Sequence, residues 1–401
     1  MNISFINEEK QYRKLFLAGI VNGIGDRFSS VAVLAMLLHL TGSGLAVGIT
    51  LAIRLIPSLF LGPIGGKLAD RFSRKTILVV TDLIRVVFAL SFIFVQSKED
   101  IWIVYVSSFI LAAGEAIYGP ARKSAIPRLV NKKHLVKVNS LEQVMVGIVL
   151  IIGALSGGIV SAIFGPDVTY LLNAISFLGA AVINYTIKFP KNEGVKKVEK
   201  PQNLISIFKK VILMSVSVQI LVLCEILIAS MNGIDNVLIS VYAINEYHLG
   251  DVGVGLFYGA LGIGLILSFS VANQLRKNFL VTGLVCLLLE GIFQLLLSQT
   301  HLVFFAFLMF CGAAFMSGIC NACFDTILMK EIPEQHQGTI FGILATILNT
   351  VLGISMLISG FALQYLTPRS LGLIGGIAYI LIAISLIVII STKTFRKRGT
   401  I

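Results

Sequence analysis

Between two long apolar runs the chain reads Gly66-Lys67-Leu68-Ala69-Asp70-Arg71-Phe72-Ser73-Arg74-Lys75. The flanking runs, at about 45–69 and 76–96, each have the length of a bilayer-spanning helix, which takes about 20 residues. Basic residues gather at the cytoplasmic ends of such spans, and this accounts for Arg71, Arg74 and Lys75. It does not account for Gly66 and Asp70 at their spacing. The stretch therefore predicts a loop with a specific structural role between two membrane helices.

The composition of the whole chain is that of a polytopic membrane protein. Of its 401 residues, 56% are hydrophobic and 13% are charged, whereas about 25% are charged in a typical soluble protein. Twelve spans of about 20 residues need about 240 residues and leave roughly 160 for loops and tails. These proportions exclude a soluble enzyme, a nucleic-acid-binding domain and a single-span receptor, and they leave no room for a large extramembrane catalytic domain.

Apolar runs of helical length predict an all-α integral membrane fold with twelve transmembrane helices. The runs lie at about 15–40, 45–69, 76–96, 101–122, 139–164, 168–189, 211–239, 250–273, 279–298, 302–329, 338–364 and 370–391. The first follows Lys10, Arg13 and Lys14 and continues past about 20 residues without a small-residue cleavage site. We therefore interpret it as a retained span and not as a signal peptide.

Lysine and arginine residues are distributed very unevenly over the loops. With the N-terminus in the cytoplasm, 27 of the 32 fall in cytoplasmic segments and only Lys98 and Arg369 fall in outside loops, while Arg27, Arg54 and Arg85 lie within spans. Basic loops stay on the cytoplasmic side. We therefore expect both termini there, in a multi-pass protein of the bacterial plasma membrane, and we assign the net charge of +12 to the inner face.

The longest polar stretch follows the sixth run and divides the chain in two. We predict an N-terminal six-helix bundle at 1–189, a basic cytoplasmic linker at 190–210 and a C-terminal six-helix bundle at 211–401. The halves resemble each other weakly, since the fourth run ends in Ser124-Ala125-Ile126-Pro127 and the tenth in Lys330-Glu331-Ile332-Pro333. Two pseudo-symmetric bundles around a midplane site are the architecture of many secondary transporters.

The loop at residues 66–75 resembles the signature loop of the major facilitator superfamily, which runs Gly-x-x-x-Asp-(Arg/Lys)-x-Gly-Arg-(Arg/Lys). Ser73 departs from this pattern because it stands where the family has glycine, and we expect a looser turn there. The match lies between the second and third of twelve predicted spans, as it does in the family. The resemblance implies the major facilitator fold.

Further motifs resemble the branch of this family that contains macrolide-efflux permeases and the enterobactin exporter. They cover about residues 15–185 and comprise Thr41-Gly42-Ser43-Gly44, Pro57 with Gly62-Pro63, Thr81-Asp82-Leu83-Ile84-Arg85, Gly119-Pro120-Ala121-Arg122 and Ile126-Pro127. The resemblance implies a drug:proton antiporter, in which export is coupled to inward proton movement. The C-terminal half matches the branch in topology more than in motif.

The family resemblance also implies a cytoplasmic gate, which closes when the protein opens outward. Its residues would be Gly66, Asp70, Arg71, Arg74, Lys75, Asp82, Arg85 and Arg122. Asp70 is placed to face a helix terminus, where a carboxylate gains about 0.3–1 kcal/mol. Asp82 and Arg85 are three residues apart on one helix face and are able to pair. A role in folding and topology alone is the alternative.

Small residues in the fifth run predict a closely packed helix. The segment Gly153-Ala154-Leu155-Ser156-Gly157-Gly158 resembles the antiporter motif Gly-Pro-x-x-Gly-Gly, with Ala154 in place of proline. Gly153, Gly157 and Gly158 would let helices approach closely, and in the family this packing seals the fifth span against the eighth. Close packing without a part in coupling is the alternative.

Ionisable residues inside spans are costly, so each is a candidate for function. In the family, spans one, four, seven and ten line the central cavity; the candidates in the first three of these are Asn22, Asp26, Glu115, Glu225, Asn232, Asp235 and Asn236. A carboxylate there can exchange a proton as the cavity changes sides. We expect Asp26 and Glu115 to couple protons, and Glu225 and Asp235 to bind substrate or protons. The alternative is local ion pairing, of Asp26 with Arg27 or Arg54 and of Glu115 with Arg122.

Other kinds of site have little support in the sequence. The five cysteines lie in apolar runs, so we expect no disulfide framework, and Cys320-x-x-Cys323 has no second ligand pair. The five histidines are scattered, so we expect no metal site. There is no phosphate-binding Gly-x-x-x-x-Gly-Lys-(Ser/Thr) loop, so we expect neither ATP as the direct energy source nor any cofactor. Glu290, in the ninth run, has no role that the sequence assigns.

Together these patterns predict a secondary active transporter, and not an enzyme, that exports amphiphilic drugs or related small molecules by proton-coupled alternating access. Its expected partners are a small-molecule substrate, protons and the lipid bilayer, without nucleic acid, and we expect it to function as a monomer. The alternatives are an exporter or flippase of a physiological solute such as a siderophore or lysophospholipid, a nutrient symporter and, more remotely, a transporter-derived sensor or membrane enzyme. Arg27 and Arg54 would favour an anionic cargo if they face the cavity.

Overall fold

The structure is a computed structural model that describes residues 5–41, 44–153, 160, 163–190, 207–209, 211–212 and 215–398. Every regular element in these residues is a helix. This follows from the apolar composition, because a chain in hydrocarbon must satisfy its own backbone hydrogen bonds and a helix does so within one segment. The predicted all-α fold is confirmed.

Twelve substantial helices are present in the described part of the chain, as predicted. They are α2 (Lys10–Thr41), α3 (Gly44–Arg71), α4 (Arg74–Ser91), α5 (Ile101–Leu129), α6 (Leu135–Ile148), α8 (Pro166–Tyr185), α10 (Val216–Val241), α11 (Gly250–Ala272), α12 (Phe279–Gln299), α13 (Val303–Glu331), α14 (Gln337–Ala362) and α15 (Pro368–Arg398). Shorter helices are α1 (Phe5–Glu8), η1 (Phe92–Phe94), η2 (Lys98–Asp100) and η3 (Lys132–His134), and single π-helical segments are η4 (Val149–Gly153) and η5 (Tyr242–Glu246).

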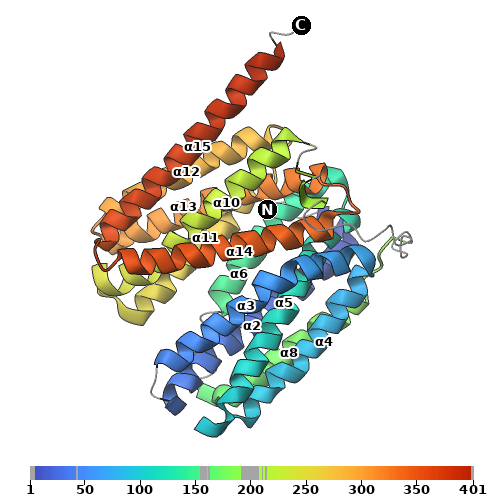
Figure 1. Cartoon of the computed structure of the whole chain (residues 1–401), viewed down its shortest axis with the longest axis vertical. Coiled ribbons are helices and arrows are strands. Elements are labelled where there is room, and N and C mark those ends of the chain that lie inside the picture. The colour runs from blue at the N-terminus through green and yellow to red at the C-terminus, as the bar shows by residue number, and fades with distance from the viewer. Residues whose placement is uncertain are drawn as a thin grey trace. The chain divides into compact units, whose positions relative to one another are not determined.

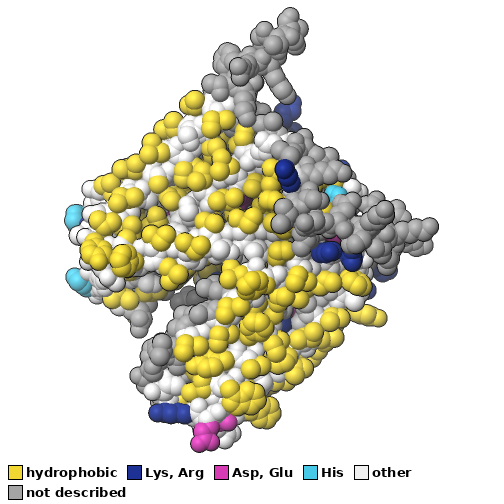
Figure 2. Space-filling model, viewed as in Figure 1, with side chains coloured by type: hydrophobic (Ala, Val, Ile, Leu, Met, Phe, Trp, Pro, Cys, Tyr) yellow, Lys and Arg dark blue, Asp and Glu magenta, His cyan; other side chains and the backbone are white. Residues whose placement is uncertain are grey.

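Ten helices within the described residues are long and apolar enough to cross a membrane. Their large apolar side chains are often exposed, among them Val87 at 63% and Leu381 at 60%. On the face seen in Figure 2, hydrophobic side chains cover most of the described surface and charged side chains are few. A surface of this kind suits lipid contact, and the protein is a multi-pass membrane protein.

Several helix ends differ from the sequence-based expectation. The fourth helix, α5, was expected to end near residue 122 but continues to Leu129, with Pro120 and Pro127 inside it. Membrane helices tolerate proline because neighbouring groups satisfy the freed carbonyls. The fifth helix begins at Leu135 instead of 139, and after Ile148 it changes to the π-helical turn η4. Residues 154–159 lie outside the described part of the chain.

The structure divides into two compact units. The first comprises residues 1–134, 148–211 and 332–347, and the second comprises residues 135–147, 212–331 and 348–401. Most of α6 is therefore grouped with the second unit, and the first turns of α14 are grouped with the first. The division at 189 and 211 into independent domains stays a prediction.

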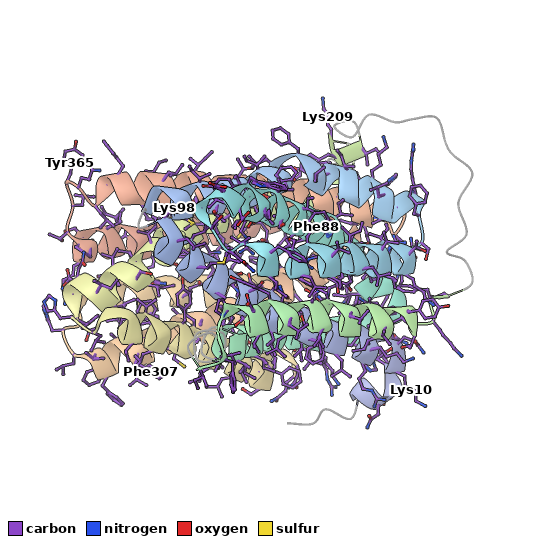
Figure 3. The ribbon with its side chains drawn as sticks, turned by 90° about the horizontal axis from the view of Figure 1, so that it is seen from below. Lys10, Phe88, Lys98, Lys209, Phe307 and Tyr365 are labelled. Atoms are coloured by element: carbon purple, nitrogen blue, oxygen red, sulfur yellow. The ribbon has the colours of Figure 1, made fainter. Side chains whose placement is uncertain are left out.

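In the first unit, α2 packs on α8, α3 packs on α5, and α4 packs on both α5 and α8 (Figure 1). Its core includes the buried side chains of Leu37, Phe92, Tyr170 and Phe177. The rings of Phe92 and Tyr170 have centroids 5.3 Å apart. Figure 3 shows Lys10, at the start of α2, and Lys98, between α4 and α5, at opposite ends of these helices.

In the second unit, α12 packs on both α13 and α15, while α11 packs on α13 and α10 on α15. An aromatic core joins α11 and α13, with the ring centroids of Phe257 and Phe310 4.8 Å apart. Near the start of α15, Arg369 Nε lies 2.8 Å from Glu246 Oε2 and the guanidinium also donates to the carbonyl of Thr300. This ion pair ties α15 to the turn after α10.

We predict that Leu37→Ala destabilises the protein by about 2–5 kcal/mol, because truncation of a fully buried leucine leaves a cavity. The measurement is thermal unfolding of the purified protein in detergent. The matched control is Leu171→Ala on α8, where the leucine is 47% exposed. An equal loss of stability in both variants would contradict the described core.

Candidate functional site

A permanently charged side chain is buried inside the first unit. Arg85, on α4, is 1% exposed. Its Nη2 lies 3.4 Å from Asp26 Oδ1 on α2, and its Nη1 lies 3.1 Å from Glu115 Oε2 on α5. Nη1 also donates to Asn22 Oδ1 at 3.2 Å. Because an unpaired buried charge is very costly, these partners are what allows Arg85 to lie there.

Asp26 has a second cationic partner. Arg54 Nη2, from α3, lies 3.6 Å from Asp26 Oδ2, and Arg54 Nη1 donates to the hydroxyl of Ser30 at 3.0 Å. The side chains of Asp26 and Arg54 are each 27% exposed, and that of Glu115 is 55% exposed. The carboxyl groups that hold the buried Arg85 are therefore themselves open to the surroundings.

Asp82 belongs to the same cluster and interacts electrostatically with Arg85, as its spacing allowed, while its hydrogen bonds come from asparagine side chains. It is fully buried and accepts hydrogen bonds from Asn22 Nδ2 at 2.7 Å and Asn184 Nδ2 at 2.9 Å. Asn22 thus links Asp82 to Arg85, since its amide donates to one and accepts from the other. Asp82 and Arg85 thus interact electrostatically along one helix, while the guanidinium contacts side chains on α2 and α5.

Neighbouring helices leave room for the Arg85 side chain. A Cβ at Gly114, on α5, would lie 2.9 Å from Arg85 Cγ, so a larger residue would press on the arginine stem. On the other side, the Arg85 guanidinium lies 4.2 Å from the ring centroid of Phe177 on α8, a cation–π contact. We call Asp26, Arg54, Asp82, Arg85 and Glu115 the charge cluster.

The signature loop of the first unit contacts the N-terminus of α14. Asp70 accepts hydrogen bonds from the backbone N–H groups of Gly338 at 2.9 Å and Thr339 at 2.7 Å. These are donors that a helix leaves free at its first turn, where the dipole also favours an anion. A Cβ at Gly66 would overlap the carbonyl oxygen of Gly338, so Gly66 permits the close approach that Asp70 uses. The expected helix-terminus role of Asp70 agrees with this geometry.

The basic residues of the loop take different positions. Arg74 is buried, with Nη2 3.5 Å from Asp70 Oδ1 and Nε donating to Ser124 at 3.0 Å. Lys75 Nζ lies 4.5 Å from the ring centroid of Tyr185, and Arg71 is exposed. Arg122, further along α5, is half-buried and near Tyr118.

The turn between α3 and α4 does not require glycine at Ser73. Ser73 has φ −60° and ψ 123°, an extended conformation that any residue adopts. Only Phe72 and Ser73 separate α3 from α4. That serine loosens this turn stays a prediction.

The second unit holds a separate polar group on α10. The hydroxyl of Tyr379, on α15, lies 3.0 Å from Asn232 Oδ1 and 2.9 Å from Asp235 Oδ2. Asn236 donates to the backbone carbonyl of Asn232 within its own helix, and Glu225 is half-buried nearer the start of α10. The structure brings Asn232 and Asp235 together, whereas Asn236 is engaged locally.

The predicted packing glycines are only partly described. A Cβ at Gly153 would lie 2.7 Å from the Cβ of Arg27 on α2, so this glycine faces the first span. A Cβ at Gly147, outside the motif, would press on the carbonyl of Gly262, so the fifth span approaches the eighth, α11, at that position. Sealing by the motif residues themselves stays a prediction. Gly157 and Gly158 lie outside the described residues.

Sequence reasoning missed several residues that contact these sites, namely Asn184, Phe177, Ser124, Gly338, Thr339 and Tyr379. Asn184 carried a usable signal, since a buried asparagine in an apolar span needs a hydrogen-bond partner. Phe177 carried none, because it is one of 26 phenylalanines. Within the described residues, no group of three or more His, Cys, Asp and Glu side chains is arranged to hold a metal ion.

The chain is similar in sequence to known transporters. A model described as Major Facilitator Superfamily matches residues 15–354. The chain is 24% identical to YfiS of Bacillus subtilis (strain 168), an uncharacterized MFS-type transporter, over 99% of this chain and 97% of that protein. It is 22% identical to macrolide efflux protein A of Streptococcus pyogenes, over 94% of this chain and 95% of that protein. The similarity to a macrolide-efflux protein thus extends well beyond residues 15–185.

The fold is also found among solved structures. The human organic anion transporter MFSD10 (TETRAN) superposes with a TM-score of 0.80 at 12% sequence identity, covering 94% of this chain and 99% of that chain. At this identity the likeness concerns the fold alone. It agrees with the twelve-helix architecture described above.

We predict that Gly114→Ala destabilises the protein by about 1–3 kcal/mol, because the added methyl group presses on the stem of buried Arg85. Thermal unfolding of the purified variant measures this. Gly119→Ala on the same helix is the matched control, because a Cβ there meets nothing within 4 Å. If the two alanines have the same effect, the tight contact between Gly114 and Arg85 is not present.

We predict that Asp70→Asn lowers stability by about 1.5–3 kcal/mol, because two charge-assisted hydrogen bonds to the start of α14 are weakened. The change is read from thermal unfolding in detergent, with the exposed Glu99→Gln as the control. Unchanged stability in Asp70→Asn would show that the contact with Gly338 and Thr339 contributes nothing measurable.

Proposed function

Because this chain belongs to the major facilitator superfamily, we propose that it is a proton-coupled exporter of amphiphilic small molecules. The family consists of secondary transporters and not of enzymes, so a small-molecule cargo and a membrane are its partners. The more specific parts of the proposal concern the coupling ion, the direction of transport and the cargo. Each of these rests on a separate observation.

The charge cluster carries the coupling proposal. It holds three carboxyl groups, of Asp26, Asp82 and Glu115, but only two guanidinium groups, of Arg54 and Arg85. With all five ionised, one negative charge is uncompensated. In a membrane interior such an excess is costly, and binding of one proton removes it. The imbalance supports a proton site in the first unit.

Asp26 and Glu115 are the groups that we propose to exchange this proton. Both contact the same Arg85, and both are partly exposed, whereas Asp82 is buried and held by two asparagine amides. When either exposed carboxyl takes a proton, Arg85 keeps its other anionic partner. When that carboxyl group loses the proton again, its ion pair with Arg85 is restored. Arg85 thus has two alternative pairing states that differ by one proton.

Alternating access links this proton site to cargo movement. We propose that the contact of Asp70 with the N-terminus of α14 holds the predicted cytoplasmic side closed in one state. The distribution of lysine and arginine supports cytoplasmic termini, and the similarity to bacterial transporters supports a bacterial plasma membrane location. We propose that a single chain carries out the cycle.

The cargo proposal rests on similarity and on charge. Full-length similarity to macrolide efflux protein A supports export of a drug-like compound. The excess of carboxyl over guanidinium groups in the charge cluster favours a cationic amphiphile over an anion.

A physiological anionic solute is the second candidate cargo. Arg54 is 27% exposed and pairs with a single carboxylate, that of Asp26. An anionic cargo that displaced Asp26 would gain a guanidinium partner, which suits carboxylate and phosphate groups. This observation favours a solute such as a siderophore as the alternative to a cationic drug.

The deciding experiment is transport in inside-out vesicles under an imposed proton gradient, followed by fluorescence dequenching. The panel contains amphiphilic cations, macrolides and siderophores. We expect compound-dependent proton release with the parent protein. We expect the release to be abolished in Asp26→Asn or Glu115→Gln, because neither amide can bind and release a proton.

Glu99→Gln, in the exposed turn η2, is the matched control and should retain the parent's response. Proton release that survives in both Asp26→Asn and Glu115→Gln would exclude these two groups as the coupling site. No proton movement with any compound, despite correctly inserted protein, would favour lipid or uncoupled solute transport instead.

A further inference from the structure

The second unit contains a buried carboxyl group that the proposed function does not use. Glu290, on α12, is 4% exposed. It has one hydrogen-bond partner, the side chain of Ser317 on α13. Its Oε2 atom is buried and has no hydrogen-bond partner among the described residues. A buried, ionised carboxylate with an unsatisfied oxygen is among the most costly groups that a membrane helix can carry.

A second carboxyl group lies near Glu290. Asp235, on α10, interacts electrostatically with it, so the two would repel each other if both were ionised. The other titratable groups that interact with Glu290 are Cys224 on α10, Cys286 on α12, Cys320 on α13 and Tyr379 on α15. Glu225 interacts with two of these cysteines. Among the described residues, this set contains no lysine or arginine.

The two carboxyl groups differ in how well their negative charge is stabilised. Asp235 receives hydrogen bonds from the Tyr379 hydroxyl, 2.9 Å away, and from the side chain of Gln294. Among the described residues, Glu290 receives a hydrogen bond from Ser317 alone. Donors that point at a carboxylate favour its ionised form, whereas burial without donors favours the neutral acid. Of the two, Glu290 is the one that gains more from a proton.

We propose that Glu290 is a proton-binding residue of the second unit, present as a neutral carboxylic acid beside an ionised Asp235. The proton neutralises Glu290, which has no lysine or arginine beside it among the described residues. Asp235 then remains as the one anion, held by the Tyr379 hydroxyl and the Gln294 side chain. Such a group releases or reloads its proton when water reaches it. The second unit thereby has a proton-binding step of its own. This assignment does not depend on the proposed export function, because a bound proton is an equilibrium property of the protein.

The test is infrared absorption of the purified protein at neutral pH, without a gradient or any cargo. A protonated carboxyl group has a carbonyl stretch that is well separated from the bands of carboxylates. We expect this band in the difference between the parent and Glu290→Gln spectra, because a proton held by the charge cluster of the first unit contributes equally to both proteins. The matched control Glu99→Gln, which changes an exposed glutamate, should keep the band.

If the band is missing from the difference between the parent and folded Glu290→Gln spectra, the proposal is overturned. A band in the difference between the parent and Asp235→Asn spectra would then place the proton on Asp235. Carboxyl-¹³C glutamate in the parent protein gives a test that needs no variant. With labelled glutamate, protonated-carboxyl absorption must shift. A shift with labelled aspartate alone would place every such proton on an aspartate and overturn the proposal. Absence of any protonated carboxyl band in the parent would also overturn the proposal.

Discussion

The guanidinium of Arg85 is a permanent positive charge enclosed by helices of an apolar bundle, and the first unit is arranged around the need to compensate it. Its partners come from three other helices: Asn22 and Asp26 from α2, Glu115 from α5 and the Phe177 ring from α8. The desolvation cost of one such ion is several kcal/mol. Without these partners, α4 could not pack against its neighbours in this way.

The partners of Arg85 also differ in what they are free to do. Asp82 is fully buried and held by two amides, so its carboxyl group is fixed in position. Asp26 and Glu115 are partly exposed and share one cation. A shared cation makes the two carboxyl groups exchangeable, and this is the physical basis for coupling a proton to a change of pairing. The carboxyl group of the signature loop has a different kind of partner. Asp70 binds backbone N–H donors, whose positions are set by the start of α14.

The two units solve the problem of buried charge in different ways. The first surrounds its carboxyl groups with arginines, whereas Asp235 and Glu290 of the second unit interact with hydroxyl, amide and thiol groups. Without a cation, the inexpensive way to neutralise a buried acid is to keep its proton. The distinction matters for transport, because an arginine-paired acid and a cation-free acid release protons under different conditions. Neither solution follows from counting charges along the chain.

Much of the fold and part of the site were open to prediction from the sequence. Hydrocarbon requires helices of about 20 residues, so composition and run length determined an all-α protein with twelve helices. The loop at residues 66–75 indicated the family, and the cost of intramembrane charge singled out Asp26, Glu115 and Asp235. These are local properties, carried by neighbouring residues. Only the tertiary structure decided the partners on other helices: the amides of Asn22 and Asn184 for Asp82, Arg85 for Glu115, and Ser317 for Glu290. Those partners lie on different helices, and side-chain pairing across helices depends on packing, which the spacing along one helix does not specify.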